Sequence, residues 1–448
     1  MATCVQTQVS QVPPQPYGRS RSLMSRSPAS SATDVKQDEQ ARMPPGASLP
    51  LIYVLMVLVV LNVEIVVPTA DQYAARLGAS ESFSGLVIAL TPIWQGILGV
   101  PLNYLMLKSG MSMKNMIILM VAFSVMGNIL YALAGLMHSK FTILASRTLI
   151  GICQCQLAGP IYIARAVGVK LRTKVMFIYS TMAAIAFFSA PWIASMLEIF
   201  VKELRIEDLV LDSDTIPGWF MATLYFIYLL LVVFFFEDAR VKETPVQPEH
   251  RDSTERFLTP GLAVCFLASF ISPTTTTMCI VFFVKLAEKT LAVSVSATGL
   301  YLGCAMAFVA LVSFASMAVT PYLEDRRGLL VTCLCACISS ILTFHLNHAW
   351  DAASITLFMC GFLLLNSFSS VVKNYGYALV PKVVAPQFKD QAGTLNMIAL
   401  QLGRGLGAQL GAVMNTTSFA ASQVGSYLVL SILVAVFYKQ LKQHDKAM

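Results

Sequence analysis

Twelve runs of mainly apolar residues follow one another along the chain, each about as long as a membrane-spanning helix. A helix rises about 1.5 Å per residue, so about 20 apolar residues cross a hydrocarbon core about 30 Å thick. Strand-like alternation is absent, which makes the α-helix the predicted spanning element. Only 12% of the residues are charged, too few for the surface of a soluble protein. The runs lie at 50–71, 83–107, 115–136, 141–164, 175–197, 217–236, 260–284, 293–319, 328–347, 352–377, 391–414 and 420–438.

Lysine and arginine are unevenly distributed between alternate loops. If the N-terminus is cytosolic, 23 of the 31 cations fall on the cytosolic side and six fall in loops on the other side. Positive residues gather in the cytosolic loops of membrane proteins, so the sequence predicts that both termini are cytosolic. The net charge of +7 reflects this bias and gives no indication of nucleic-acid binding.

Polar segments divide the chain into five predicted parts. Residues 1–48, rich in Pro, Ser, Gln and Arg, predict a disordered cytosolic tail. A polar, proline-bearing cytosolic linker at 237–259 separates six runs from six. The expected fold is therefore an all-α polytopic membrane protein with twelve transmembrane helices in two six-helix bundles, 49–236 and 260–438, followed by a short tail at 439–448. This organisation is typical of secondary transporters.

Six motifs occur in a fixed order: IVVPTADQYAARLGAS, GNILYALAG, SRTLIGI, DTIPGWFM, LEDRRGLLVT and LGRGLGAQLG. Together they resemble the major facilitator superfamily (MFS) branch that contains the plant vacuolar SPX–MFS phosphate transporters, and that branch is also similar to the lysosomal MFS chloride-channel proteins. The resemblance covers residues 51–411, and no SPX domain is expected in the first 48 residues. It implies solute transport and points to a vacuolar or lysosomal membrane.

The fourth run departs from the phosphate-carrying relatives. Those relatives place several arginines after the glycine of the motif that reads SRTLIGI here. At the same place this chain reads GICQCQLAGPIYIAR. This departure argues against phosphate as the solute. The positions at which a phosphate site would need cations are occupied by Gln154, Gln156, Gly159, Pro160 and Ile161.

Glu64 is a carboxylate within the outer third of the first run. An ionisable group at the centre of a span costs about 2.5–3.5 kcal/mol and persists only where it is paired, hydrated or functional. On a continuous helix Glu64, Pro68 and Asp71 share one face, and Pro68 can kink the helix and free a carbonyl. Glu64 and Asp71 are candidate proton-coupling residues. For Glu64, a structural ion pair or hydrogen bond to another helix is the alternative.

Two arginines are further candidates. Arg147 in the fourth run lies at about the depth of Glu64, so the two are candidates for an ion pair, and Gln154 continues its face. The resemblance implies that Arg147 faces the central cavity, where substrate binding and a gating or packing role both remain open. Arg404 lies near mid-membrane in the eleventh run, shares a face with Gln401, and is a candidate contact for an anion. Glycines at 403, 407 and 411 predict close approach of another helix.

The seventh run contains the motif SPTTTTM, in which Pro273 is expected to break the helix. The hydroxyls of Thr274, Thr275, Thr276 and Thr277 then either cap the break or line a polar pathway. Asn366 in the tenth run is another candidate substrate contact. Lys373 shares its face and is expected to reach the cytosol.

The leading prediction is a secondary transporter of a small polar or anionic solute that works by alternating access. Glu64 would either couple the cycle to protons or neutralise an arginine. The alternatives are a passive anion channel of an acidic organelle and a non-transporting receptor. No nucleophile–base pair or metal cluster is recognisable, so neither enzymatic activity nor a cofactor is expected. The expected partners are a small molecule or ion and the lipid bilayer. The sequon at Asn415 lies close to the membrane and is expected to be unused.

Overall fold

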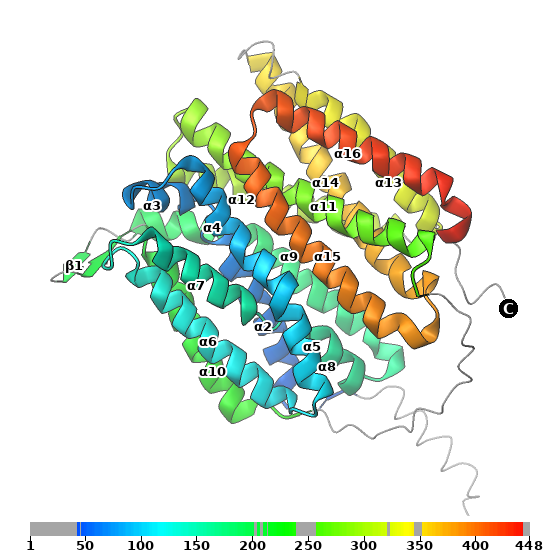
Figure 1. The fold of residues 1–448 in the computed structure, drawn as a ribbon, viewed down its shortest axis with the longest axis horizontal. Helices are drawn as coiled ribbons and strands as arrows, with labels where there is room; N and C mark the ends of the chain where they lie inside the picture. Colours follow the sequence, from blue (N-terminus) through cyan, green and yellow to red (C-terminus); the bar gives the residue numbers. More distant parts are fainter. Residues whose placement is uncertain are drawn as a thin grey trace, which may run out of the picture.

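The computed structural model describes residues 43–44, 46–200, 204–206, 209–212, 214–238, 257–319, 323–344 and 352–441. Most of the predicted tails and most of the predicted linker lie outside these residues. Helices dominate, and they form two groups: an N-terminal group coloured blue to green and a C-terminal group coloured green to red (Figure 1).

Within the part of the chain that the structure describes, the N-terminal group contains six helical rods, of which two are broken and one contains a π-helical turn. The rods are α2 (Ser48–Glu64) with α3 (Ala70–Arg76); α4 (Glu81–Trp94) with the π turn η1 (Gln95–Gly99) and α5 (Val100–Lys108); α6 (Met113–Leu133); α7 (Lys140–Ile152) with α8 (Ala158–Ala166); α9 (Val169–Phe200); and α10 (Ile216–Phe235).

The C-terminal group repeats this number of rods with fewer interruptions. They are α11 (Pro260–Lys285) with the π turn η2 (Leu286–Thr290); α12 (Val295–Val319); α13 (Asp325–Leu342); α14 (Ala352–Val383); α15 (Lys389–Val413), preceded by the 3-10 turn η5 (Pro386–Phe388); and α16 (Thr416–Val436), followed by η6 (Tyr438–Leu441).

The predicted fold class is confirmed. Among the described residues, eight helical stretches are long and apolar enough to cross a membrane. The first and fourth rods are divided into shorter helices by their breaks. The ninth begins with three charged residues, and the eleventh is rich in Gly and Gln. Length and composition alone therefore do not identify these four rods as membrane-spanning.

Each half has its own apolar core, and the halves meet along two pairs of helices. Most of the buried apolar side chains divide into one cluster centred on the N-terminal rods and one centred on the C-terminal rods. Between the halves, α4 packs along α15 and α9 packs along α12. At the second contact, the Trp192 indole donates a hydrogen bond to the Leu300 carbonyl over 3.1 Å. The second rod thus meets the eleventh, and the fifth meets the eighth.

The connection between α9 and α10 contains the two described strands, β1 (Leu204–Ile206) and β2 (Leu209–Leu211), paired antiparallel. The residues that follow anchor this connection to the first rod. The Arg76 guanidinium pairs with Asp212 and lies 3.1 Å from an Asp214 carboxylate oxygen. The Tyr73 hydroxyl, one turn before Arg76, donates to the Tyr131 carbonyl of α6 over 3.0 Å.

Asp214 is expected to make the stability of this connection depend on pH. Burial raises the pKa of its carboxyl from 3.8 to about 6, while the Arg76 charge opposes the rise. Because the folded-state pKa is the higher one, the folded protein binds a proton in this window that the unfolded chain releases. The contribution of Asp214 to stability therefore falls as the pH rises through that window. Melting temperatures measured across it should decline with pH more steeply in the wild type than in Asp214→Asn. Parallel curves would contradict the assignment.

Candidate functional site

The first rod is interrupted beside Glu64. Helix α2 ends at this residue, a turn occupies 65–69, and α3 resumes at Ala70. Pro68 accounts for the break because it has no N–H to donate to the carbonyl four residues back, which belongs to Glu64. That carbonyl instead accepts a hydrogen bond from the Val67 N–H over 3.1 Å. The predicted kink is confirmed, but the expectation that Glu64, Pro68 and Asp71 share a face of one continuous helix is wrong.

Glu64 forms an ion pair with Arg404 of α15, and this pair joins the two halves of the molecule. The Arg404 guanidinium donates to Glu64 Oε1, and the two side chains are only 12% and 6% exposed. The sequence suggested Arg147 as the partner. The structure corrects this, because the break in the first rod and the close approach of α15 bring Arg404 to the carboxylate instead.

Arg147 is fully buried and bonded to backbone within the N-terminal half. Its Nη1 donates to the Asn62 carbonyl over 3.1 Å, and its Nε donates to the Val87 carbonyl over 3.4 Å. The Thr91 hydroxyl in turn donates to the Arg147 carbonyl over 3.2 Å. Arg147 thereby connects α7 to α2 and α4. This geometry fits the packing alternative of the sequence analysis.

The fourth rod is interrupted where the sequence reads CQCQ, between Ile152 and Ala158. The side chains of neighbouring helices satisfy the exposed carbonyls of this break. Asn103 Nδ2 donates to the Gln154 carbonyl over 2.7 Å, and the Tyr179 hydroxyl donates to the Gln156 carbonyl over 3.3 Å. The Gln154 side chain is buried, and its Nε2 lies 3.5 Å from the Val59 carbonyl.

A chain of three glutamine side chains also connects the two halves. Gln156 Oε1 accepts hydrogen bonds from Gln95 Nε2, at 2.8 Å, and from Gln401 Nε2. Gln401 belongs to α15 and precedes Arg404 by three residues, so the glutamine chain and the ion pair occupy neighbouring turns of one helix. The sequence analysis did not select Gln95 or Gln156 as site residues. The signal was present in the two glutamines of the fourth rod, but their partner came from a helix far away in the sequence.

The threonines of the seventh rod lie in an unbroken helix. Helix α11 continues through Pro273, so the expected helix break is wrong. The Thr274 hydroxyl donates to the Phe270 carbonyl over 2.6 Å, which is the bond to the preceding turn that the sequence offered as one alternative. Thr275 Oγ1 donates to Gln423 Oε1 over 2.7 Å, and Thr276 lies 3.3 Å from the Ser369 hydroxyl. Thr277 is buried.

Two residues of α14 have different surroundings although they share a face of this helix. Asn366 is buried, and its Nδ2 donates to the Phe362 carbonyl over 3.0 Å. Lys373 is half-buried and lies within electrostatic range of Arg404. Helix α14 continues for about 15 Å beyond Lys373, to Val383, and the reach of this side chain to the cytosol stays a prediction. A second cation thus lies near the ion pair.

Asp71 belongs to a separate contact between the two halves. Its carboxylate lies 2.9 Å from Lys289 Nζ, which follows α11 in the C-terminal half. Nearby, Gln409 Nε2 donates to the Ser82 carbonyl over 3.3 Å. The remaining cleft, lined by Asp71, Glu288 and Lys289 among others, has a volume of about 20 Å³, which is room for about one water molecule. The structure therefore does not bring Asp71 to Glu64.

The described residues define a protein of a particular class: two six-helix bundles of membrane-spanning helices, joined at their interface by a buried ion pair and a glutamine chain. Among these residues, no three His, Cys, Asp or Glu side chains gather to hold a metal ion. The sequence profile of the Major Facilitator Superfamily matches residues 52–438, and the chain belongs to this family. It is a multi-pass membrane protein with the fold of the family's transporters.

Plant membrane proteins are among the relatives of this chain. An SPX domain-containing membrane protein of Arabidopsis thaliana is 24% identical over 88% of this chain and 63% of its own length. A second one from the same plant is 25% identical over 89% of this chain and 63% of its own length. The chain thus spans less than two thirds of the curated relatives that it matches first.

Solved transporter structures share the fold. A D-xylose-proton symporter superposes with a TM-score of 0.69 at 12% identity, covering 89% of this chain and 98% of that one. A bacterial homologue of the human lysosomal transporter Spinster, in an inward-facing conformation, gives 0.63 at 15% identity and covers 88% and 95%. The human organic anion transporter MFSD10 gives 0.57 at 14% identity and covers 86% and 98%. At these identities the likeness concerns the fold alone.

Proposed function

We propose that the protein is a secondary transporter of a small anion that works by alternating access, and that the anion and the Glu64 carboxylate compete for Arg404. The observation that carries this proposal is the Glu64–Arg404 pair itself, because it joins α2 of one half to α15 of the other. Rocking one half against the other requires contacts of this kind to form and break.

The charges around the pair favour an anion over a neutral solute. Arg404 and Lys373 are both cations, and Glu64 is the carboxylate that contacts Arg404. A planar guanidinium can hold a carboxylate-like or phosphate-like group through two parallel hydrogen bonds, so an anionic substrate can replace Glu64 on Arg404. Gln401, one turn away on the same helix, supplies an amide beside that position.

Proton coupling follows from the same competition. A protonated Glu64 no longer neutralises Arg404, which leaves the guanidinium available to an anion. Anion and proton therefore bind together, and both leave when the pair re-forms. The cycle needs only the exchange of one carboxylate for another anion, with no covalent step. Arg147 remains a candidate for supporting this site indirectly, by fixing α2 through the Asn62 carbonyl.

The orientation and the location are part of the proposal. With both termini in the cytosol, Asp71 and Lys289 lie at the non-cytosolic end, where their ion pair links the two halves. The resemblance to vacuolar and lysosomal proteins supports an acidic organelle, whose proton gradient would then drive the anion towards the cytosol.

Uptake into proteoliposomes tests the proposal. Chloride, phosphate, small carboxylates, sugars and amino acids are offered under an imposed pH gradient. We expect an anion to be taken up faster when the substrate side is acidic, and we expect Glu64→Gln to remove this pH dependence. Asp390→Asn, an exposed acid-to-amide change at the start of α15, is the matched control and should behave as wild type. Unchanged pH dependence in Glu64→Gln would refute coupling at this residue. Fluxes of channel size that ignore the gradient would favour a passive conduit.

A further inference from the structure

We propose that an acyl chain of a membrane lipid occupies a groove within the C-terminal half, formed by α11, α12 and α14. The groove has a volume of about 490 Å³, and its lining includes Phe283, Tyr301, Cys304, Phe308, Met359 and Leu363. This volume falls within the roughly 300–1,000 Å³ that is usual for ligand pockets. No residue of the N-terminal half lines it, so it is separate from the Glu64–Arg404 site.

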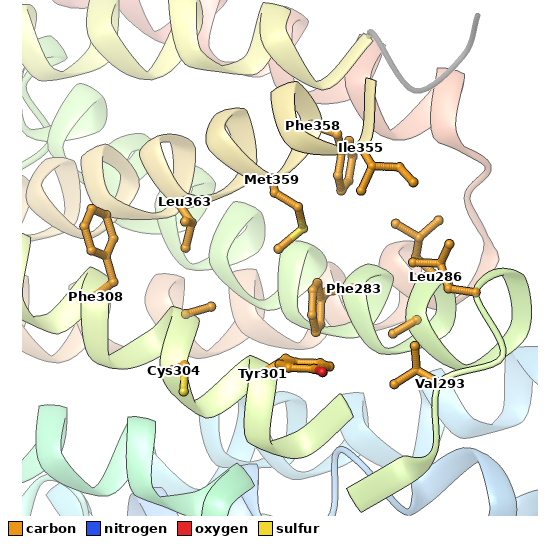
Figure 2. Close-up of a pocket in the computed structure, with 13 residues that line it drawn as sticks. Phe283, Leu286, Val293, Tyr301, Cys304, Phe308, Ile355, Phe358, Met359 and Leu363 are labelled. Atoms are coloured by element: carbon orange, nitrogen blue, oxygen red, sulfur yellow. The ribbon is translucent and has the colours of Figure 1, made fainter. Parts of the chain in front are cut away.

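The chemistry of the lining selects a hydrocarbon ligand. None of the 13 lining residues is charged, and the Tyr301 hydroxyl is the one strong hydrogen-bonding side-chain group among them. Figure 2 shows Phe283 of α11 and Leu286 of η2, with Tyr301, Cys304 and Phe308 of α12 on one side and Met359 and Leu363 of α14 on the other. An apolar space of this kind does not hold ordered water. A polar solute would lose its hydration there without gaining a partner.

The groove is open towards the surroundings of the bundle. Tyr301 is 60% exposed and Phe308 is 42% exposed, and Cys304 between them is also exposed. All three belong to a helix of membrane-spanning length and composition. The medium at this surface is therefore lipid, and the molecules nearest to the mouth are acyl chains.

The length of the groove matches one leaflet. Its lining extends from the connection after η2, at Leu291 and Val293, down to Phe308 on α12 and Leu363 on α14. These last two residues lie about 20 Å and about 16 Å from the beginnings of their helices, at about 1.5 Å per residue. Half of a hydrocarbon core about 30 Å thick is about 15 Å. One chain lying parallel to the helices, in the leaflet opposite the predicted cytosolic side, fills this space.

The acyl chain in the groove contacts a helix that joins the two halves of the molecule. Helix α12 packs against α9 of the N-terminal half, and Trp192 contacts its backbone at Leu300. Tyr301, the next residue along α12, lines the groove. A lipid in the groove therefore supports a helix that forms one of the two long contacts between the halves.

Photo-crosslinking tests this proposal on the full-length protein. The probe is a phosphatidylcholine with a diazirine near the end of one acyl chain, incorporated into nanodiscs, and the adducts are mapped by peptide mass spectrometry. We expect adducts on segments 300–308 and 355–363 to exceed those on the lipid-exposed surface of α13 around Ile338, which is 65% exposed, by about tenfold.

Two filling variants and one control complete the test. Cys304→Trp places an indole in the groove from α12, and Met359→Trp places one there from α14. Either substitution should remove most of the groove adducts. Leu311→Trp, at a 65% exposed position of the same helix outside the groove lining, should leave them unchanged. Gel filtration verifies that each variant is folded. Equal labelling of all lipid-facing surfaces would overturn the proposal, as would groove adducts that persist in both filling variants.

Discussion

Replacing Arg404 by glutamine is expected to abolish anion transport and to lower the free energy of unfolding by about 3 kcal/mol or more. The reason is that Glu64, 6% exposed, would keep its position in the interface without the cation that compensates it. Glu64→Gln should cost a comparable amount by leaving Arg404 unpaired. The double variant Glu64→Gln/Arg404→Gln should recover much of the loss, because two neutral amides leave no charge buried.

Thermal unfolding of the purified wild type and the three variants measures this coupling. The Lys382–Asp325 pair is the matched control, since it joins opposite charges inside the C-terminal half with Lys382 42% exposed. Neutralising either member of that pair should cost less than about 1 kcal/mol. Strictly additive losses for Glu64 and Arg404 would mean that the two side chains do not interact in the membrane protein, and the proposed competition for Arg404 would have no basis.

Substitution of Gly407 by alanine is expected to be the most damaging single-methyl change in α15. A Cβ at this position would overlap the Thr274 carbonyl of α11, and the neighbouring Gly403 and Gly411 face the Phe270 and Met278 carbonyls in the same way. Backbone atoms cannot move aside as a side chain can. We therefore expect a cost near the upper end of the roughly 1–3 kcal/mol that is usual for overpacking.

Gly393→Ala, on the same helix, is expected to change the stability of the protein in the opposite direction. A Cβ at Gly393 meets no atom within 4 Å, and alanine is favoured over glycine inside a helix by about 1 kcal/mol. Melting temperatures should therefore fall for Gly407→Ala and rise slightly for Gly393→Ala. Equal shifts in the two variants would show that helix propensity, rather than the contact with α11, governs this ridge.

The glycine ridge illustrates what local sequence pattern can predict. Gly403, Gly407 and Gly411 recur every four residues and therefore share a face, so close helix packing was predictable without knowing the partner. The structure confirms the close approach and identifies α11 as the partner. The kink at Pro68 was predictable for a similar reason, because a missing N–H acts on the carbonyl one turn away.

Pro273 shows where such local rules stop. It has the same missing N–H as Pro68, yet α11 continues through it while the first rod breaks at 65–69. Helix α11 packs extensively against both α14 and α15, and we attribute its continuity to this packing. Tertiary contacts of this kind outweigh a local preference of a few kcal/mol, and they are invisible in a window of sequence.

The sequence by itself determined that this protein lies in a lipid bilayer, which class of fold it adopts, and that its few charges within the spans need partners. Hydrophobic run length, cation distribution and the cost of an ion in lipid are properties of single segments. Only the tertiary structure decided that Glu64 meets Arg404 rather than Arg147, that Gln156 links Gln95 to Gln401, and that Asp71 belongs to a separate contact between the two halves. Each of these partners is fixed by how the two halves pack, because an ion pair or hydrogen bond acts over a few ångströms of space regardless of the number of residues between its members.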